Sequence, residues 1–447
     1  MDRLRKQISR SAIVWAAAIA VLCSSTLLTA QNSQKFLAEH SAPSPRIVVL
    51  HRFTGSADGR VPAGQLIADH AGNLYGTTER GGTADNGIVF ELSPPGMKGG
   101  QWIEKVLYRF KGGSDGLAPT AGLVFDPAGN LYGTTFDGGN CHQSCGVVFQ
   151  LARPTSQSGS WTERVLHAFG GVNSSDGGGP TGSLVFDKAG NLYGTTEFGG
   201  NVVCTNNPGP CGVVFQLSPP KSHGGRWTET VIYNFKGIPD GAFPFGYLTI
   251  DTQGNLFGAT TQGGTGGCTD GEGTTIGCGI ALKLTSGKGG VWSETLLYNF
   301  QVSDSGPGLD WLLDSAGALY GPGGYNIIKL LPPAGHGDPW TQEVLHQFKG
   351  GISGRLPSSG VIADPSGNLY GATWANAIES LYGTVYKLSP PTMKDGKWSL
   401  ITLHEFPGNF NSAQPFGLLL RSEAGFLYGT TRSLAGGSDE IVFKIIP

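Results

Sequence analysis

The stretch AGNLYGTT at Ala71–Thr78 decides the fold of this chain, because it returns along the sequence at long, regular intervals. It recurs as Ala128–Thr135 and Ala189–Thr196. Looser copies lie around Asn255, Ala318, Asn368 and Phe426. The seven copies are spaced 50 to 64 residues apart. Internal repetition with a period of this length predicts a repeat architecture in which each copy is one supersecondary unit.

Each copy contains four strand-length apolar runs in the same order, rich in β-branched and aromatic residues. In the second copy these are GLVFD (122–126), NLYGTT (130–135), GVVFQL (146–151) and ERVLHAF (163–169). Because Val147-Val148-Phe149 is apolar on both faces, each sheet must be covered on both sides. Four-stranded antiparallel sheets packed face to face around an axis supply that cover. We therefore predict an all-β, seven-bladed β-propeller.

Two glycines recur in every copy and indicate where the backbone is constrained. The first, in the turn between the first two runs, is expected in the left-handed conformation of a tight hairpin. It is Gly72, Gly129, Gly190, Gly254, Gly317, Gly367 and Gly425. The second follows the aromatic residue of the motif and indicates crowding inside the inner strands, where a side chain would clash. It is Gly76, Gly133, Gly194, Gly258, Gly321, Gly371 and Gly429.

The two ends of the repeat region predict how the ring closes. The last copy stops after its third run, Ile441–Ile446, while Arg46–Phe53 (RIVVLHRF) reads as an unpartnered fourth strand. We expect this N-terminal strand to complete the seventh blade and to hide the free sheet edges, giving 28 strands as seven times four. Residues 46–447 would then form a single propeller domain.

The residues before the propeller predict export. Basic residues precede an apolar run at Ala12–Leu22, and small residues follow as far as Ala30, so residues 1–30 read as a secretory signal peptide. Residues 31–45 are expected to be a flexible segment. The apolar run is shorter than the roughly 20 residues of a membrane-spanning helix, so we expect no membrane span after cleavage. The destination would be oxidising: periplasmic, extracellular or cell-surface.

Composition excludes other classes of protein. The 447 residues include 73 Gly and 27 Pro, and only 14% are charged, which describes a turn-dense globular chain poor in helix-forming surface. The formal net charge is -3, from 30 basic and 33 acidic residues, and leaves no basic stripe for a nucleic-acid backbone.

The repeat resembles that of the GloVer tandem-repeat proteins, which are exported and differ in how they are anchored. The similarity rests on the pattern GNLYGTT..GG....G.VF.L.P and extends over Val48–Ile446. It weakens in copies five to seven, where Gly321-Pro322-Gly323 and Gly371-Ala372-Thr373 replace Gly-Thr-Thr. The resemblance implies the repeat fold and export, and it brings no catalytic residues.

Six cysteines sit in the same loop of three consecutive copies, between the second and third runs. They are Cys141 and Cys145, Cys204 and Cys211, and Cys268 and Cys278. The pairs enclose three, six and nine residues, whereas a metal site would keep its ligand spacing fixed. The drift in spacing favours three local disulfides over zinc or redox sites in an exported chain.

An Asp-Gly-x-x-Pro sequence recurs between blades and suggests either turn caps or a calcium site. Its aspartates are Asp58, Asp115, Asp176 and Asp240. The equivalent residues in the remaining copies are Ser303, Ser353 and Asn411. Asp, Ser and Asn share the ability to cap a turn but not to ligate a hard cation equally well, so capping is favoured. Calcium stays possible, and no other cofactor is expected.

Residues that break the repeat on the face of these loops are the candidates for binding. They are His142 and Glu272 in cysteine loops, Trp374 and Glu379 in the altered sixth copy, and Asp310 and Trp311 near the fifth inner strand. A histidine or tyrosine recurs at one position of the fourth strand, and a slot that accepts either ring favours packing over catalysis. The histidines are His51, His167, His346 and His404, and the tyrosines are Tyr108, Tyr233 and Tyr298.

Three functions are compatible with this pattern. We favour a monomeric binding scaffold for a glycan, small-molecule or protein ligand, with the stapled loops of copies two to four as one wall of a groove. The fifth copy, with Gly323-Gly324-Tyr325 in place of a loop, would leave the groove open. A carbohydrate- or lactone-processing enzyme would instead require a deep axial pocket with converging carboxylates and a perturbed histidine. A purely structural module would have no concave site.

Overall fold

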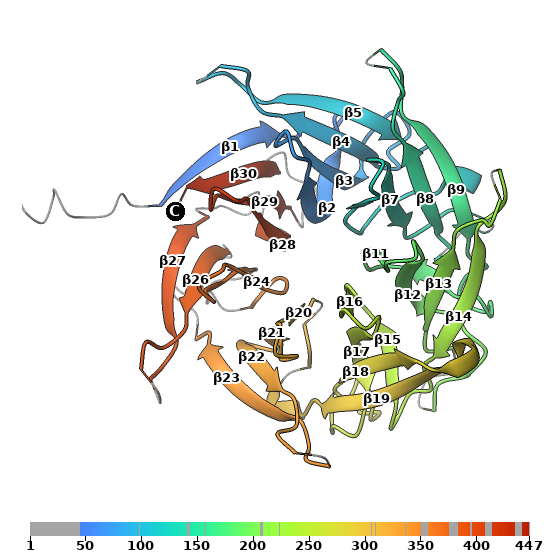
Figure 1. Cartoon of the computed structure of the whole chain (residues 1–447), viewed down its shortest axis with the longest axis vertical. Helices are drawn as coiled ribbons and strands as arrows, with labels where there is room; N and C mark the ends of the chain where they lie inside the picture. Colours follow the sequence, from blue (N-terminus) through green and yellow to red (C-terminus); the bar gives the residue numbers. More distant parts are fainter. Residues whose placement is uncertain are drawn as a thin grey trace, which may run out of the picture. The chain divides into compact units, whose positions relative to one another are not determined.

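The propeller predicted from the repeat is confirmed. The computed structural model describes residues 45–446 apart from 98, 140, 142–143, 157, 206–208, 223, 305, 309, 336, 350–355, 375–382, 394–395, 407–413 and 434–439. Within the unit Arg46–Ile446, seven antiparallel sheets stand around a common axis (Figure 1). The predicted signal peptide, 1–30, lies outside the described residues. No helix in the described part is long and apolar enough to cross a membrane.

The first four blades run in chain order from the axis outward. Blade 1 is β2 (Arg60–Ala68), β3 (Leu74–Arg80), β4 (Ile88–Ser93) and β5 (Ile103–Arg109), and blade 2 is β6 (Val124–Phe125), β7 (Leu131–Thr135), β8 (Val147–Ala152) and β9 (Thr162–Ala168). Blade 3 is β10 (Gly178–Pro180), β11 (Val185–Phe186), β12 (Leu192–Phe198), β13 (Val213–Ser218) and β14 (Thr228–Asn234). Blade 4 is β15 (Gly241–Pro244), β16 (Thr249–Ile250), β17 (Leu256–Gly263), β18 (Ile280–Ser286) and β19 (Trp292–Asn299).

The last three blades complete the ring. Blade 5 is β20 (Leu312–Leu313), β21 (Leu319–Gly323), β22 (Asn326–Leu331) and β23 (Thr341–Gln347), and blade 6 is β24 (Ile362–Ala363), β25 (Leu369–Thr373), β26 (Thr384–Ser389) and β27 (Ser399–Glu405). Blade 7 is β28 (Gln414–Arg421), β29 (Leu427–Arg432), β30 (Ile441–Ile446) and β1 (Arg46–Arg52). Three short 3-10 helices lie in connections: η1 (Gly113–Asp115), η2 (Lys288–Gly290) and η3 (Val302–Asp304).

The N-terminal strand closes the seventh blade, as predicted. β1 pairs antiparallel with β30, from Arg46 opposite Ile446 to Arg52 opposite Ile441 (Figure 1). The described residues form 30 strands instead of 28, because the inner strand of blades 3 and 4 is split into two pieces. Both pieces pair with the second strand of their blade, so each blade keeps the predicted order.

The core consists of clusters between neighbouring blades. In five of the seven blade contacts, the phenylalanine directly after a fourth strand packs against the aromatic ring of the next blade's third strand, as Phe110 meets Phe149 edge to face with centroids 5.2 Å apart. The motif glycine makes this possible, because a Cβ at Gly133 would stand 2.7 Å from Phe149 Cζ. This confirms the crowding predicted from the sequence.

The hairpins between first and second strands are capped as expected. The turn glycines, such as Gly72 and Gly129, have φ of 82° and 81°. Asp126 Oδ1 accepts hydrogen bonds from the backbone N–H groups of Ala128 and Asn130, both at 2.9 Å. In blade 7, Ser422 takes this place and accepts from Phe426 N at 3.2 Å. These caps lie on the face opposite the disulfide loops.

Candidate axial binding site

A cavity of about 310 Å³ lies on the propeller axis and is bordered by residues of all seven blades. Every blade contributes residues near the start of its inner strand, such as Thr120 and Thr181, and blades 1, 2, 3 and 7 add a residue at or just after the end of the second strand, as at Phe136. Because the first and second strands are antiparallel, both places lie at the same end of the blade, where the loop between the second and third strands begins. The cavity therefore belongs to the face that carries the disulfides.

Tyr247 and Asp310 separate this cavity from a second one of about 320 Å³ further along the axis. The Tyr247 hydroxyl accepts a hydrogen bond from Gln65 N at 3.1 Å, so the ring reaches from blade 4 to blade 1. Tyr247 N in turn donates to Asp310 Oδ1 at 3.3 Å. The second cavity is lined mainly by apolar side chains, among them Leu123 and Leu184. The polar chemistry is thus concentrated on the disulfide side of the two residues.

Three carboxylates and one guanidinium line the cavity. Arg432 of blade 7 pairs with Glu79 of blade 1 at 2.9 Å and lies over the ring of Phe416, 5.0 Å from its centroid. Burial raises the pKa of Glu197. Burial also raises the pKa of Asp310, which is 6% exposed, to about 6. Glu79 thus has a cationic partner, whereas Glu197 and Asp310 have none among the described residues.

Hydroxyl groups in the wall are buried without partners. The Oγ atoms of Thr120, Thr181 and Ser358 make no hydrogen bond to any described residue. Thr181 is 6% exposed, and its hydroxyl oxygen is buried at the cavity wall. A buried hydroxyl left unpaired costs about 1 to 3 kcal/mol. A ligand with polar groups in the cavity would relieve that cost.

One repeat position supplies most of the charge. It is the residue that follows the Gly-Thr-Thr of the motif, and it differs in almost every blade. Its occupants are Glu79, Phe136, Glu197, Thr261, Gly324, Trp374 and Arg432. The sequence reasoning selected only Trp374 from this series. The signal that would have found the others is high variability directly after the most regular motif of the chain.

The predicted binding residues are not brought together. Asp310 borders the polar cavity, whereas its neighbour Trp311 is 4% exposed, packs in the core and borders only the second, apolar cavity. Its indole lies 2.8 Å from the Cβ position of Gly321 and 6.0 Å from the ring of Phe300. It fills the space that an aromatic residue of the third strand fills in blades 1, 2, 3, 6 and 7, because blade 5 has Ile328 there.

The remaining predicted binding residues lie further from the cavity or are not described. Glu272 is exposed at the tip of the fourth blade's disulfide loop, where its N–H donates to Asp270 Oδ1 at 2.9 Å. Trp374 is half-buried at its position after β25. His142 and Glu379 lie outside the described residues.

The aspartates of the Asp-Gly-x-x-Pro turns lie between the outer strands of adjacent blades. Asp58 accepts a hydrogen bond from Thr54 N at 2.8 Å, and Asp240 accepts one from Lys236 N at 3.0 Å. Asp176 lies beside the strand's aromatic position, with its Oδ2 3.0 Å from His167 Nε2. Asp115 likewise accepts from the hydroxyl of Tyr108. These contacts are those of turn caps.

In the connection to blade 5 the expected position was wrong by one residue. Asp304, not Ser303, accepts the hydrogen bond from Gln301 N at 2.8 Å and that from the Tyr298 hydroxyl at 3.4 Å. Counting four residues back from Pro307 gives Ser303. The 3-10 helix η3 tightens this turn, and the capping position is one residue later. The other two equivalents, Ser353 and Asn411, lie outside the described residues.

A glutamate of the following blade faces each of the four aspartates. Glu104, Glu163, Glu229 and Glu294 occupy one position of β5, β9, β14 and β19. Burial, reinforced by the negative charge of the facing aspartate, raises the pKa of the first three to about 7. Across the described chain, no three His, Cys, Asp or Glu side chains are grouped so that they could hold a metal ion. Calcium binding here stays an untested prediction.

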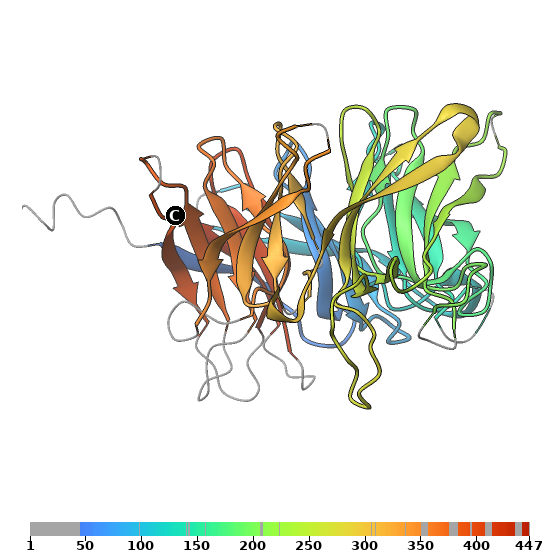
Figure 2. The same cartoon turned by 90° about the horizontal axis from the view of Figure 1, so that it is seen from below.

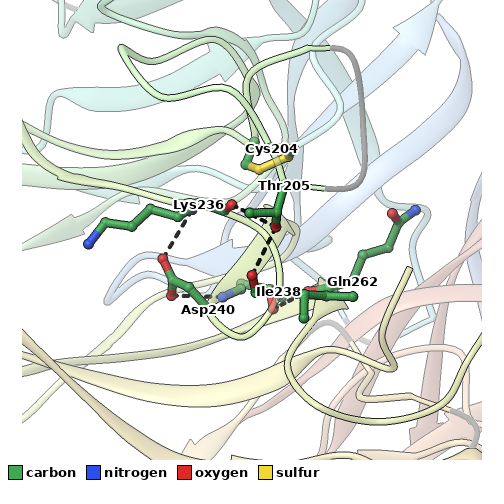
Figure 3. The surroundings of a disulfide bond; sticks show 9 residues. Cys204, Thr205, Lys236, Ile238, Asp240 and Gln262 are labelled. Carbon is green, nitrogen blue, oxygen red and sulfur yellow. Dashed lines mark hydrogen bonds between the residues drawn. A yellow bond between two sulfur atoms is a disulfide. The ribbon is translucent and has the colours of Figure 1, made fainter. Parts of the chain in front are cut away.

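The three predicted disulfides are present: Cys141–Cys145, Cys204–Cys211 and Cys268–Cys278. The olive connection that holds the third extends well beyond the strands in Figure 2. Next to the second, Thr205 Oγ1 donates to the carbonyls of Lys236 and Ile238 at 3.2 and 2.9 Å (Figure 3). The disulfide loop is thereby tied to the connection between blades 3 and 4. Three disulfides indicate an oxidising compartment outside the cytoplasm.

Two of the disulfides are also linked by backbone hydrogen bonds to the wall of the cavity. The carbonyl of Cys145 accepts from Gly179 N at 3.1 Å, and that of Cys211 accepts from Phe243 N at 2.8 Å. Each donor lies two residues before a residue that lines the cavity, Thr181 or Phe245. The second cysteine of these two disulfides thus holds the start of the next blade's inner strand in place.

The fold and the cavity define a disulfide-bonded, seven-bladed propeller with a polar chamber on its axis. The chain belongs to the Gloeobacter/Verrucomicrobia repeat family, whose repeat matches residues 39–270. This confirms the resemblance to the GloVer proteins. A search of curated proteins finds no match.

Solved propellers resemble the chain at low identity. A putative gluconolactonase is 12% identical with a TM-score of 0.43, covering 90% of this chain and 92% of its own. The PQQ domain of pyranose dehydrogenase from Coprinopsis cinerea is 14% identical with a TM-score of 0.43, covering 91% and 96%. The PQQ-bound aldose sugar dehydrogenase from Streptomyces coelicolor is 12% identical with a TM-score of 0.42, covering 90% and 98%. At these values the structures carry no inference about activity.

Proposed function

We propose that this protein is an exported binding protein that takes a small polar ligand into the axial cavity on its disulfide face. The observation that carries the proposal is a cavity of about 310 Å³ whose wall presents buried, unpartnered hydroxyls of Thr120, Thr181 and Ser358. Ligand sites are concave, of this size, and hold a few convergent polar groups on an otherwise apolar wall. The periplasm, the cell surface and the extracellular medium all suit the disulfides.

The alternatives weighed from the sequence fare differently. The hypothesis of a purely structural module is tied to the absence of a concave site, and the axial cavity speaks against it. An enzyme is favoured by one observation, the buried carboxyl of Asp310 with its pKa raised to about 6, a value that suits proton transfer near neutral pH. The histidine expected of an enzyme is missing among the described residues that line the cavity. We therefore place binding first and a carbohydrate- or lactone-processing activity second.

The test is a binding screen of the mature, oxidised protein against monosaccharides, polyols, lactones and amino compounds, read by thermal shift and by calorimetry. Thr120→Phe fills the cavity from its wall and should abolish binding of any hit. Thr295→Phe, on the exposed outer strand β19, is the matched control and should bind normally. Binding unchanged in a folded Thr120→Phe protein would place the ligand elsewhere. Turnover of a hit, lost in Asp310→Asn, would favour the enzyme.

A further inference from the structure

The cavity carries more negative than positive charge. Glu79, Glu197 and Asp310 line it, and Arg432 is the one cation among the described lining residues. Arg432 is already engaged by Glu79 at 2.9 Å. Among the described residues, Asp310 accepts hydrogen bonds from the backbone N–H groups of Tyr247 and Gly360, and Glu197 makes no hydrogen bond or ion pair to any side chain. Desolvated carboxylates without a counter-charge are costly, so a bound cation would stabilise them.

A bare metal ion fits this arrangement poorly. Calcium takes six to eight oxygen ligands at about 2.3 to 2.6 Å, which requires the carboxylates to converge on one point. In the described part of the chain no such convergence of three ligand side chains exists. Glu197 lies near the end of the second strand of blade 3, whereas Asp310 precedes the inner strand of blade 5. The positive charge is therefore better carried by an organic group on a ligand large enough to span the cavity.

The rest of the wall indicates what that ligand carries besides charge. The unpartnered hydroxyl of Thr181, a residue 94% buried by its 6% exposure, points to a ligand with hydrogen-bonding groups. A hydroxyl offers one donor and two acceptor sites, which matches hydroxyl groups on a ligand. Phe136 and Phe245 add aromatic surface for C–H faces or for a cation. Together these groups suit a polyhydroxylated ring that bears an amine.

We infer that the axial cavity binds an amino sugar or a closely similar polyhydroxylated amine, with its ammonium group held by Glu197, its hydroxyls held by Thr181 and its neighbours, and Asp310 adding negative charge to the same cavity. This inference rests on the proposed function of the same cavity and names the class of its ligand. Selectivity follows from the charge, because a neutral sugar leaves the two carboxylates uncompensated. N-acetylation of the amine removes the charge and adds bulk, so it should weaken binding.

The experiment is calorimetry of the mature protein at pH 7 with glucosamine, glucose, N-acetylglucosamine and calcium chloride as separate probes. We expect glucosamine to bind at least tenfold more tightly than glucose and N-acetylglucosamine. Glu197→Gln should reduce glucosamine affinity about tenfold and leave glucose affinity nearly unchanged. Glu343→Gln, on the exposed face of β23, is the matched control and should change neither. Glucosamine affinity should also fall at pH 5, where Asp310 becomes protonated.

Each other outcome is decisive. Equal affinity for glucose and glucosamine, or no effect of Glu197→Gln, overturns the inference but leaves the cavity as a neutral-sugar site. Calcium that binds tightly and competes with the sugars overturns it in favour of a metal site. If no compound of the wider screen binds either, the proposed function itself fails.

Discussion

The carboxyl pairs between blades predict a contribution to the stability of this propeller that falls as pH rises. Glu104, Glu163 and Glu229 each face an aspartate of the preceding connection, and burial raises their pKa from 4.5 to about 7. Because the pKa of each glutamate is higher in the folded than in the unfolded chain, its protonated form stabilises the fold fully at pH values below 4.5. This contribution to the free energy of unfolding is lost as pH rises through 7. A shift of that size corresponds to about 3.4 kcal/mol for a fully buried group. These side chains are only partly buried, so screening by solvent reduces it to about 1 kcal/mol each.

Replacing the three glutamates by glutamine isolates this contribution from all others. Neighbouring groups act on the same clusters: Asp58, which Glu104 faces, lies 3.6 Å from His51, and the pKa of His51 is lowered by burial, which favours the fold at high pH. The comparison therefore concerns the difference between the two proteins. The free energy of unfolding of the wild type should drop by about 3 kcal/mol more between pH 4.5 and pH 8 than that of the triple variant, as measured by urea denaturation.

Blade 5 shows that glutamine is tolerated at this position. Gln342 occupies the equivalent place in β23, and its Oε1 accepts a hydrogen bond from the Tyr298 hydroxyl at 2.7 Å. The triple variant is thus expected to fold. Parallel pH profiles for the two proteins would refute the reasoning, since they would mean that the glutamates titrate alike in the folded and unfolded chains. A Glu343→Gln protein, altered on an exposed part of β23, should keep the wild-type profile.

Three further predictions follow from the packing, the staples and the axis. Gly133→Ala should destabilise the protein by about 1 to 3 kcal/mol in chemical denaturation, because its Cβ would stand 2.7 Å from Phe149 Cζ, whereas Gly96→Ala, with open space around it, should be neutral. Replacing Cys268 and Cys278 by serine should lower the free energy of unfolding by about 3 kcal/mol, because the unfolded chain gains entropy. Replacing Cys141 and Cys145, which close a shorter loop in blade 2, should lower it by about 2 kcal/mol. Asp310→Asn should raise stability at pH 8 but not at pH 3, since the carboxyl's pKa of about 6 makes its ionisation unfavourable for the fold; equal effects at both pH values would contradict this.

The fold could be predicted from the sequence because its determinants are local and repeated. The turn glycines, the motif glycines and the order of four apolar runs each recur seven times, so chance resemblance is averaged out. Ring closure by Arg46–Arg52 followed from counting strands, and the disulfides followed from the drift in cysteine spacing. Where one copy departs from the rest, the prediction failed locally. Asp304 replaced Ser303 as the cap, and Trp311 proved to fill a core space.

The site could be predicted only in part, because its residues meet through ring closure. Asp310 was selected as an unusual residue and does border the cavity. Glu79, Glu197 and Arg432 were not selected, since each looks unremarkable in its own copy. Their relation appears only when the residues after Gly-Thr-Thr are compared as one series around the axis. Tyr247 was missed for the same reason: its hydrogen bond to Gln65 joins blades that lie far apart in the sequence.

Divergence at the axis has a physical reason that does not apply to the outer strands. Four of the seven equivalent positions line one cavity there, so one charged residue repeated at them would bring like charges together in a partly desolvated space. The observed series instead sets Arg432 of blade 7 beside Glu79 of blade 1, so that the last and first copies of one repeat position form an ion pair. Hydroxyl, aromatic and carboxyl side chains occupy other members of the ring. The regular strands of the blades thus form the walls of the axial cavity, and the variable residue after Gly-Thr-Thr supplies most of its charged groups.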